Sequence, residues 1–116
     1  METPKVHESE YRFCLIMWEN EPETCAKLAS LSKEQLGWSR TTTYTVIKRL
    51  EERGILKKEG SVVKSLYSKE DIQVSEINEV LEKKFEGSIP AFIAAFAKSK
   101  RLTDKDREEI LKLLGE

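Results

Sequence analysis

Apolar and polar positions follow a helical period over most of this 116-residue chain. Residues 8–20 contain an unbroken apolar run, 13–18, which predicts a helix that is buried on more than one side. Pro22 interrupts the pattern, and Thr24 can cap a second, shorter helix that ends near Leu36. The positions of this second helix that we expect to face inward are Ala26, Leu28, Ala29 and Leu31.

The stretch WSRTTTYTVIKRLEERG, residues 38–54, predicts a third helix. Ser39 is a favourable N-cap, and Gly54 is typical of the left-handed residue that closes a helix. Three short helices joined by tight connections predict a helix-turn-helix arrangement. At 100° per residue, one side of the third helix faces the core, and that side carries Thr43, Val46, Ile47 and Leu50.

The period changes after the third helix. The segments 55–58, ILKK, and 62–68, VVKSLYS, are rich in branched and aromatic residues and flank a polar turn at 59–61. This pattern predicts a two-stranded β-hairpin, which would form a wing behind the helix-turn-helix. Three further helices are predicted at 76–86, 89–99 and 104–114. Their expected caps and first-turn residues are Ser75, Ser88 with Pro90, and Thr103 with Asp106.

The outward face of the third helix carries hydroxyls, a phenol and cations, and no carboxylate before Glu51. Such side chains fit the DNA major groove, because hydroxyls meet base edges, threonine methyls pack on thymine, and cations neutralise phosphates. The helix N-terminus also favours a phosphate. The alternative is that Ser39 and the threonines only start the helix. The outward stripe is Thr41, Tyr44, Thr45 and Lys48, flanked by Thr42 and Arg49.

Charge is distributed unevenly along the chain, although the formal net charge is only -1. Residues 38–69 carry eight Lys/Arg against three Asp/Glu, a net of +5, between two segments that are each net -3. This island fits a localised anion-binding surface, and the alternative is a solvated charged face. Its predicted hairpin lysines are Lys57, Lys58, Lys64 and Lys69.

These elements predict a mostly α fold with a small β-hairpin wing (α+β), a winged helix-turn-helix. We expect a DNA-binding domain over residues 1–70 and a C-terminal helical dimerisation region over residues 71–116. The last helices carry more apolar surface than they can bury alone, which indicates an interface between two copies. The residues predicted for this interface are Ile77, Leu81, Phe85, Ile89, Phe92, Ile93 and Phe96, beside Val80 on the first stripe.

No catalytic constellation is evident, so the chain is not expected to be an enzyme. His7 is the single histidine, it lies near the N-terminus, and no glycine-rich phosphate loop occurs. Cys14 and Cys25 stand alone and are expected to be buried, which favours neither a disulfide nor a metal site, and no cofactor is implied. No segment approaches the roughly 20 apolar residues of a membrane span, so a soluble cytoplasmic protein is expected.

Specific motifs carry a resemblance to a known family over nearly the whole chain. They are LIMWE in the first helix, WSRTTTYTVIKRLEERGIL and the wing ending in LYS, then FEGSIPAFIAAF and LTDKDREEILKLL. The chain resembles the penicillinase repressor (BlaI/MecI-type) family of bacterial transcriptional regulators, which also includes copper-responsive repressors. The resemblance implies a winged-helix repressor that binds a palindromic operator as a homodimer through its C-terminal helices.

The resemblance also implies which residues meet DNA. Its motif carries the reading positions onto Ser39, Thr41, Thr42, Tyr44 and Thr45, where Tyr44 replaces the basic residue of some members. We add the cations of the third helix and of the wing to these positions. The full set of residues predicted to bind DNA is Ser39, Arg40, Thr41, Thr42, Tyr44, Thr45, Lys48, Arg49, Lys57, Lys58 and Lys64.

The chain departs from the family's known switches. Antibiotic-responsive members are cut at an Asn-Phe bond, whereas the matching bond here is Ala95-Phe96. Copper-responsive members have a C-terminal cysteine cluster, whereas no cysteine follows Cys25. The sequence therefore specifies neither the inducing signal nor the operator. A protein–protein adaptor is the alternative function, because winged helices also serve as interaction modules.

Overall fold

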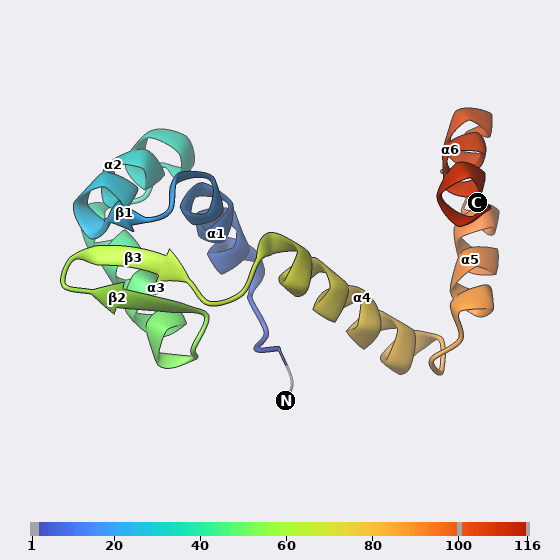
Figure 1. Ribbon diagram of the computed structural model, residues 1–116, viewed down its shortest axis with the longest axis horizontal. Coiled ribbons are helices and arrows are strands. Elements are labelled where there is room, and N and C mark those ends of the chain that lie inside the picture. Colours follow the sequence, from blue (N-terminus) through green and yellow to red (C-terminus); the bar gives the residue numbers. More distant parts are fainter. Residues whose placement is uncertain (1–2, 100, 116) are drawn as a thin grey trace. The chain divides into compact units, whose positions relative to one another are not determined.

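The computed structural model describes residues 3–99 and 101–115 (Figure 1), and it has the predicted α+β winged-helix fold. It divides into two compact units, the first ending at Glu76 and the second beginning at Ile77. The elements of the first unit are α1 (Glu8–Asn20), β1 (Glu23–Thr24), α2 (Cys25–Leu36), α3 (Arg40–Glu52), β2 (Leu56–Glu59) and β3 (Val62–Ser65). The remaining helices are α4 (Lys69–Lys84), which spans the division, α5 (Ile89–Lys98) and α6 (Asp104–Leu114).

Helices α2 and α3 begin at the capping residues that the sequence predicts. The Thr24 side chain accepts a hydrogen bond from the Lys27 backbone N–H (3.1 Å) at the start of α2. Ser39 does the same for Thr42 (3.1 Å) at the start of α3. These bonds satisfy backbone donors that have no partner inside the helix, which fixes both starting points.

The end of α3 leads the chain directly into the wing. Gly54 has φ +76, and its N–H donates to the Glu51 carbonyl (3.0 Å), while the Ile55 N–H donates to the Leu50 carbonyl (2.9 Å). This pair of bonds is a Schellman motif, which needs a left-handed residue and so favours glycine. Ile55 is completely buried just beyond the turn, so the hydrophobic core anchors the start of the hairpin.

The core of the first unit joins all three of its helices to the wing. Its largest fully buried side chains include Phe13, Met17, Leu28, Leu50 and Val63. The inward face predicted for α2 was partly wrong, because Ala26 is exposed. Once Leu28 faces inward, the helical period makes Cys25 and Ser32 its buried neighbours instead.

The wing is a three-stranded antiparallel sheet rather than a two-stranded hairpin, with strand order β1-β3-β2. The added strand β1 has only two residues, too few to leave an alternating pattern in the sequence. The residues just before β1 are also held against β3. The Glu21 carboxylate accepts hydrogen bonds from the Ser65 backbone N–H and hydroxyl (both 2.7 Å).

Helix α4 begins well before the predicted position. The expected N-cap, Ser75, lies inside the helix, and Ser68 takes that role. Ser68 and Asp71 form a reciprocal capping box, each side chain accepting the other's backbone N–H (both 3.0 Å). The early start places Ile72 in the core of the first unit. The caps predicted for α5 and α6, Ser88 and Thr103, are confirmed.

Candidate nucleic-acid interface

Helix α3 separates its two faces as the sequence predicts, except that Tyr44, expected on the outward stripe, is half-buried against the core. Thr43, Val46, Ile47 and Leu50 are all buried, and Thr43 and Leu50 have no exposed surface. Thr41, Thr45 and Lys48 are exposed on the opposite side. The hydroxyls of Thr41 and Thr45 have no hydrogen-bond partner among the residues that the structure describes. They are therefore free to bond to an external ligand.

Ser39 and Thr42 are engaged with each other. The Ser39 hydroxyl accepts the Thr42 backbone N–H and donates to Thr42 Oγ1 (2.9 Å). Both side chains are exposed, so external contacts remain accessible to them. Their present contacts are those of a helix cap, and the two residues differ in this respect from Thr41 and Thr45.

Arg40 and Tyr44 form a contact that the sequence analysis missed. The Arg40 Nη2 donates a hydrogen bond to the Tyr44 hydroxyl (3.0 Å), and its guanidinium carbon lies 5.2 Å from the centroid of the Tyr44 ring. Tyr44 is half-buried and packs against the core, whereas Arg40 is exposed. The spacing of four residues allows this contact in any helix, but many i, i+4 pairs do not form one.

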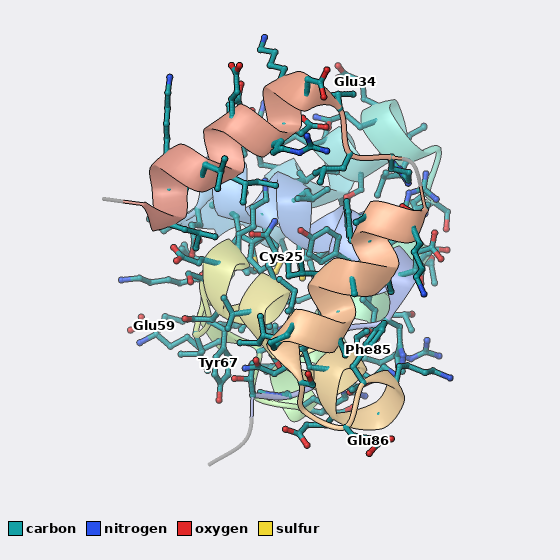
Figure 2. The ribbon with its side chains drawn as sticks, turned by 90° about the vertical axis from the view of Figure 1, so that its right-hand side faces the viewer. Cys25, Glu34, Glu59, Tyr67, Phe85 and Glu86 are labelled. Atoms are coloured by element: carbon teal, nitrogen blue, oxygen red, sulfur yellow. The ribbon has the colours of Figure 1, made fainter. Side chains whose placement is uncertain are left out.

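The wing lysines do not all share one face. Lys57 and Lys64 are cross-strand partners in the register of β2 and β3, so their side chains leave the same face of the sheet. Lys58 lies opposite Val63, which is completely buried, and it therefore belongs to the other face. Glu59 at the wing tip is exposed (Figure 2) and forms an ion pair with Lys57 (3.4 Å).

The positive segment of the sequence corresponds to consecutive elements of one unit. Residues 38–69 form α3, both long strands of the wing and the first residue of α4. The cations predicted for the interface are exposed, including Lys48 and Arg49 on α3 and Lys58 and Lys64 on the wing. A surface of this kind attracts anions.

A partly buried ion pair fixes the C-terminal end of α3 against α1. Arg53 donates to both carboxylate oxygens of Glu10 (2.8 and 2.9 Å) and also to the Lys5 carbonyl. Glu10 is buried. Burial alone would raise the pKa of the Glu10 carboxyl. The hydrogen bonds from Arg53 and from the His7 backbone, together with the Arg53 charge, lower it by more, so the pKa lies below its ordinary value. The two partners lie 43 positions apart in the sequence, so no local pattern predicts their contact.

The cysteines and the histidine do not assemble into a chemical site. Cys14 and Cys25 are buried (Cys25 is labelled in Figure 2), and burial raises the pKa of the Cys14 thiol to about 12, which makes it unreactive. His7 is exposed immediately before α1. Among the residues that the structure describes, no group of three or more His, Cys, Asp and Glu could hold a metal ion. None of the described helices is long and apolar enough to cross a membrane.

The second unit presents a different kind of surface. None of the described residues of α5 and α6 is buried. The residues predicted for a dimer interface fall into two groups. Leu81 is buried, and Phe85 (Figure 2) packs edge-to-face on Phe92 with ring centroids 5.4 Å apart. The predicted residues that are exposed are Ile77, Ile89, Ile93 and Phe96.

Helix α6 contributes apolar surface that the sequence analysis left out. Ile110, Leu111, Leu113 and Leu114 are exposed, although their spacing gives an apolar stripe that the helical period could have revealed. A cavity of about 400 Å³ opens between α5 and α6. Its lining residues are Phe92, Ile93, Phe96, Leu102, Arg107, Ile110, Leu111 and Leu114.

Comparison with known protein families matches residues 6–116 to the family described as penicillinase repressor. The match covers both units, so it includes the helix-turn-helix, the wing and the C-terminal helices. No curated protein gives a match to this chain.

Proposed function

The chain belongs to the penicillinase repressor family of DNA-binding transcriptional repressors, and we propose that it acts as a homodimer on a palindromic operator. The observation that carries this proposal is the outward face of α3. It combines two unpartnered threonine hydroxyls, Thr41 and Thr45, with cations and no carboxylate before Glu51. An ordinary solvated helix alternates carboxylates and amines, and this face does not.

Two classes of contact follow from this surface. The residues toward the start of the recognition helix, where side chains reach base edges in the major groove, are Arg40, Thr41, Thr42 and Thr45. Tyr44 lies beside them and contacts Arg40. The DNA phosphate backbone would be contacted by Ser39, Lys48 and Arg49, together with the wing lysines. The phosphate contacts proposed for the wing are those of Lys57, Lys58 and Lys64.

The C-terminal region, proposed to be residues 71–116, would provide the dimer interface. Exposed Ile93 and Phe96 of α5 and Leu111 of α6 are apolar groups that a second copy would remove from water. A partner side chain entering the cavity between α5 and α6 would add to this burial. A two-fold dimer carries two copies of α3, which is why its operator would be an inverted repeat.

The test is selection of preferred sites from random duplex DNA by the full-length protein, followed by affinity measurements across a salt series. We expect an enriched inverted repeat with half-sites about one helical turn apart, and affinity that falls steeply with salt. Selection of no sequence, together with salt-insensitive binding to a protein surface, would instead support an adaptor.

A further inference from the structure

The Arg40 side chain is held over α3 by two separate contacts with Tyr44. One is the hydrogen bond from Arg40 Nη2 to the Tyr44 hydroxyl (3.0 Å), and the other is the cation–π contact with the ring, at 5.2 Å from its centroid. The ring itself packs against the core of the first unit. Tyr44 therefore provides a fixed platform, and the guanidinium on it is restricted in both position and orientation.

Restricted orientation matters for one kind of DNA contact more than for another. An arginine side chain has many rotamers, and part of this conformational freedom is lost when a directional contact forms. A guanine offers O6 and N7 in a fixed geometry that matches a planar guanidinium, whereas phosphate attraction needs mainly charge. A pre-oriented guanidinium is thus best explained by base recognition.

Resting on the proposed function, we propose that Arg40 reads a guanine in each half-site and that Tyr44 is the residue that positions it. Arg40 is the first residue of α3, and the N-terminal residues of a recognition helix contact base edges. Tyr44 occupies one N–H of the guanidinium, which has five donors, so a bidentate contact remains available. Tyr44 then acts through Arg40 instead of reading a base by itself.

The experiment compares Arg40→Lys, Tyr44→Leu, Tyr44→Phe and the double variant Arg40→Lys/Tyr44→Leu with the parent protein. Each is titrated with the selected operator and with operators in which each guanine is replaced in turn. We expect Arg40→Lys and Tyr44→Leu to lose roughly five- to 150-fold of the preference for the same guanine. Tyr44→Phe keeps the ring and should retain most of the preference. The double variant should lose no more than Arg40→Lys alone.

Random duplex DNA separates positioning from a general electrostatic role. Arg40→Lys keeps the charge, so its affinity for random DNA should stay close to that of the parent. Arg12→Lys is the matched control, because Arg12 is exposed on α1 and is not among the proposed DNA contacts, so this change should alter no base preference. Thermal unfolding of each variant establishes that it folds, and Arg40→Lys and Tyr44→Phe keep the test decisive if Tyr44→Leu does not.

Three outcomes would overturn the inference while leaving the repressor function intact. The first is a selected operator without a guanine that responds to Arg40. The second is a Tyr44→Leu variant that weakens all sequences equally, as loss of a phosphate contact would. The third is independent effects of the two residues in the double variant. If the parent protein selects no sequence at all, the proposed function itself fails, and this inference fails with it.

Discussion

Lys57 and Lys64 lie directly opposite each other across the two long strands of the wing. Like charges in this position destabilise a sheet, because their side chains leave the same face a short distance apart. The Glu59 carboxylate pairs with Lys57, but Lys64 has no ion pair among the residues that the structure describes. An anion bound at this face would relieve the repulsion, which is what a DNA phosphate would do.

Replacing Lys64 with glutamine tests this role of the wing. Lys64→Gln removes the repulsion with Lys57, so the free energy of unfolding should rise by roughly 0.2–1 kcal/mol. Affinity should fall about equally for all duplex sequences, and the slope of log K against log salt should fall by about one unit per protomer. Lys83→Gln on α4 is the control and should leave the slope unchanged. A change of sequence preference at constant slope would mean that Lys64 contacts a base.

The Glu10–Arg53 pair predicts how stability depends on pH. The pKa of the Glu10 carboxyl is lowered in the folded state, so its stabilisation is complete above the ordinary glutamate pKa of about 4.3. That contribution is lost as the pH falls through the lowered value. Arg53→Gln removes the charged partner of the Glu10 carboxylate, which should cost roughly 1–3 kcal/mol near pH 7.

Chemical denaturation at several pH values measures this effect. Arg53→Gln should lose most of its deficit in acid, where Glu10 is protonated in both proteins and no unpaired charge is buried. The double variant Glu10→Gln/Arg53→Gln should be more stable at pH 7 than Arg53→Gln alone, because it buries no charge. An equal deficit at pH 7 and in acid would show that Arg53 acts through packing and not through its charge.

Capping residues in the sequence predicted where several helices begin and end, because a cap acts on backbone groups only a few residues away. Ser39 and Gly54 marked the ends of α3 in the sequence because each satisfies orphan backbone groups within a few residues of itself. The start of α4 was missed although Ser68 and Asp71 carry a capping box, since Ser75 offered a competing cap nearer to the apolar stripe. A choice between two caps depends on tertiary packing, here on the burial of Ile72.

Contacts between distant residues left no signal that a single sequence reveals. The Glu10–Arg53 pair and the bond from the Glu21 carboxylate to Ser65 each join residues more than 40 positions apart. The faces of α3 were predictable, because a helical period assigns them. Which outward side chains contact each other, as Arg40 and Tyr44 do, depends on rotamers that the period does not specify.

The proposed dimer is tested at Ile93 in preference to Phe92. Phe92 packs on Phe85 and Phe96 within one protomer, so Phe92→Asp would also disturb the fold of the second unit. Ile93 is 49% exposed, and Ile93→Asp should mainly place a charge in the interface between two copies. We expect sedimentation at micromolar concentration to show a dimer for the parent and a monomer for the variant, with weakened operator binding.

A control variant tests whether the effect of Ile93→Asp comes from the added charge alone or from its place in the proposed interface. Ser9 is exposed on α1 of the first unit, and Ser9→Asp introduces the same charge outside the proposed dimerisation region, residues 71–116. This variant should remain a dimer. A parent protein that sediments as a monomer at that concentration would contradict the dimer proposal directly.

Thr45 tests the major-groove assignment most directly. It is exposed in the second turn of α3, too far from the N-terminus to cap the helix, and its hydroxyl has no partner among the described residues. Thr45→Ala improves helix propensity, so the free energy of unfolding should hold or rise slightly. Affinity for the selected operator should fall by roughly 1–3 kcal/mol, with a much smaller loss on random duplex DNA.

Two other positions of the same motif serve as controls for Thr45. Thr43 is completely buried, and its hydroxyl has no hydrogen-bond partner in the part of the chain that the structure describes. Thr43→Val keeps the shape and removes the unsatisfied group, so it should stabilise the fold by about 1 kcal/mol without changing operator affinity. Ser39→Ala removes the cap of α3 and should cost about 1 kcal/mol of stability, with a modest, sequence-independent loss of affinity. If Thr45→Ala instead lowers the melting temperature and binds the operator as the parent does, Thr45 is structural and does not read DNA.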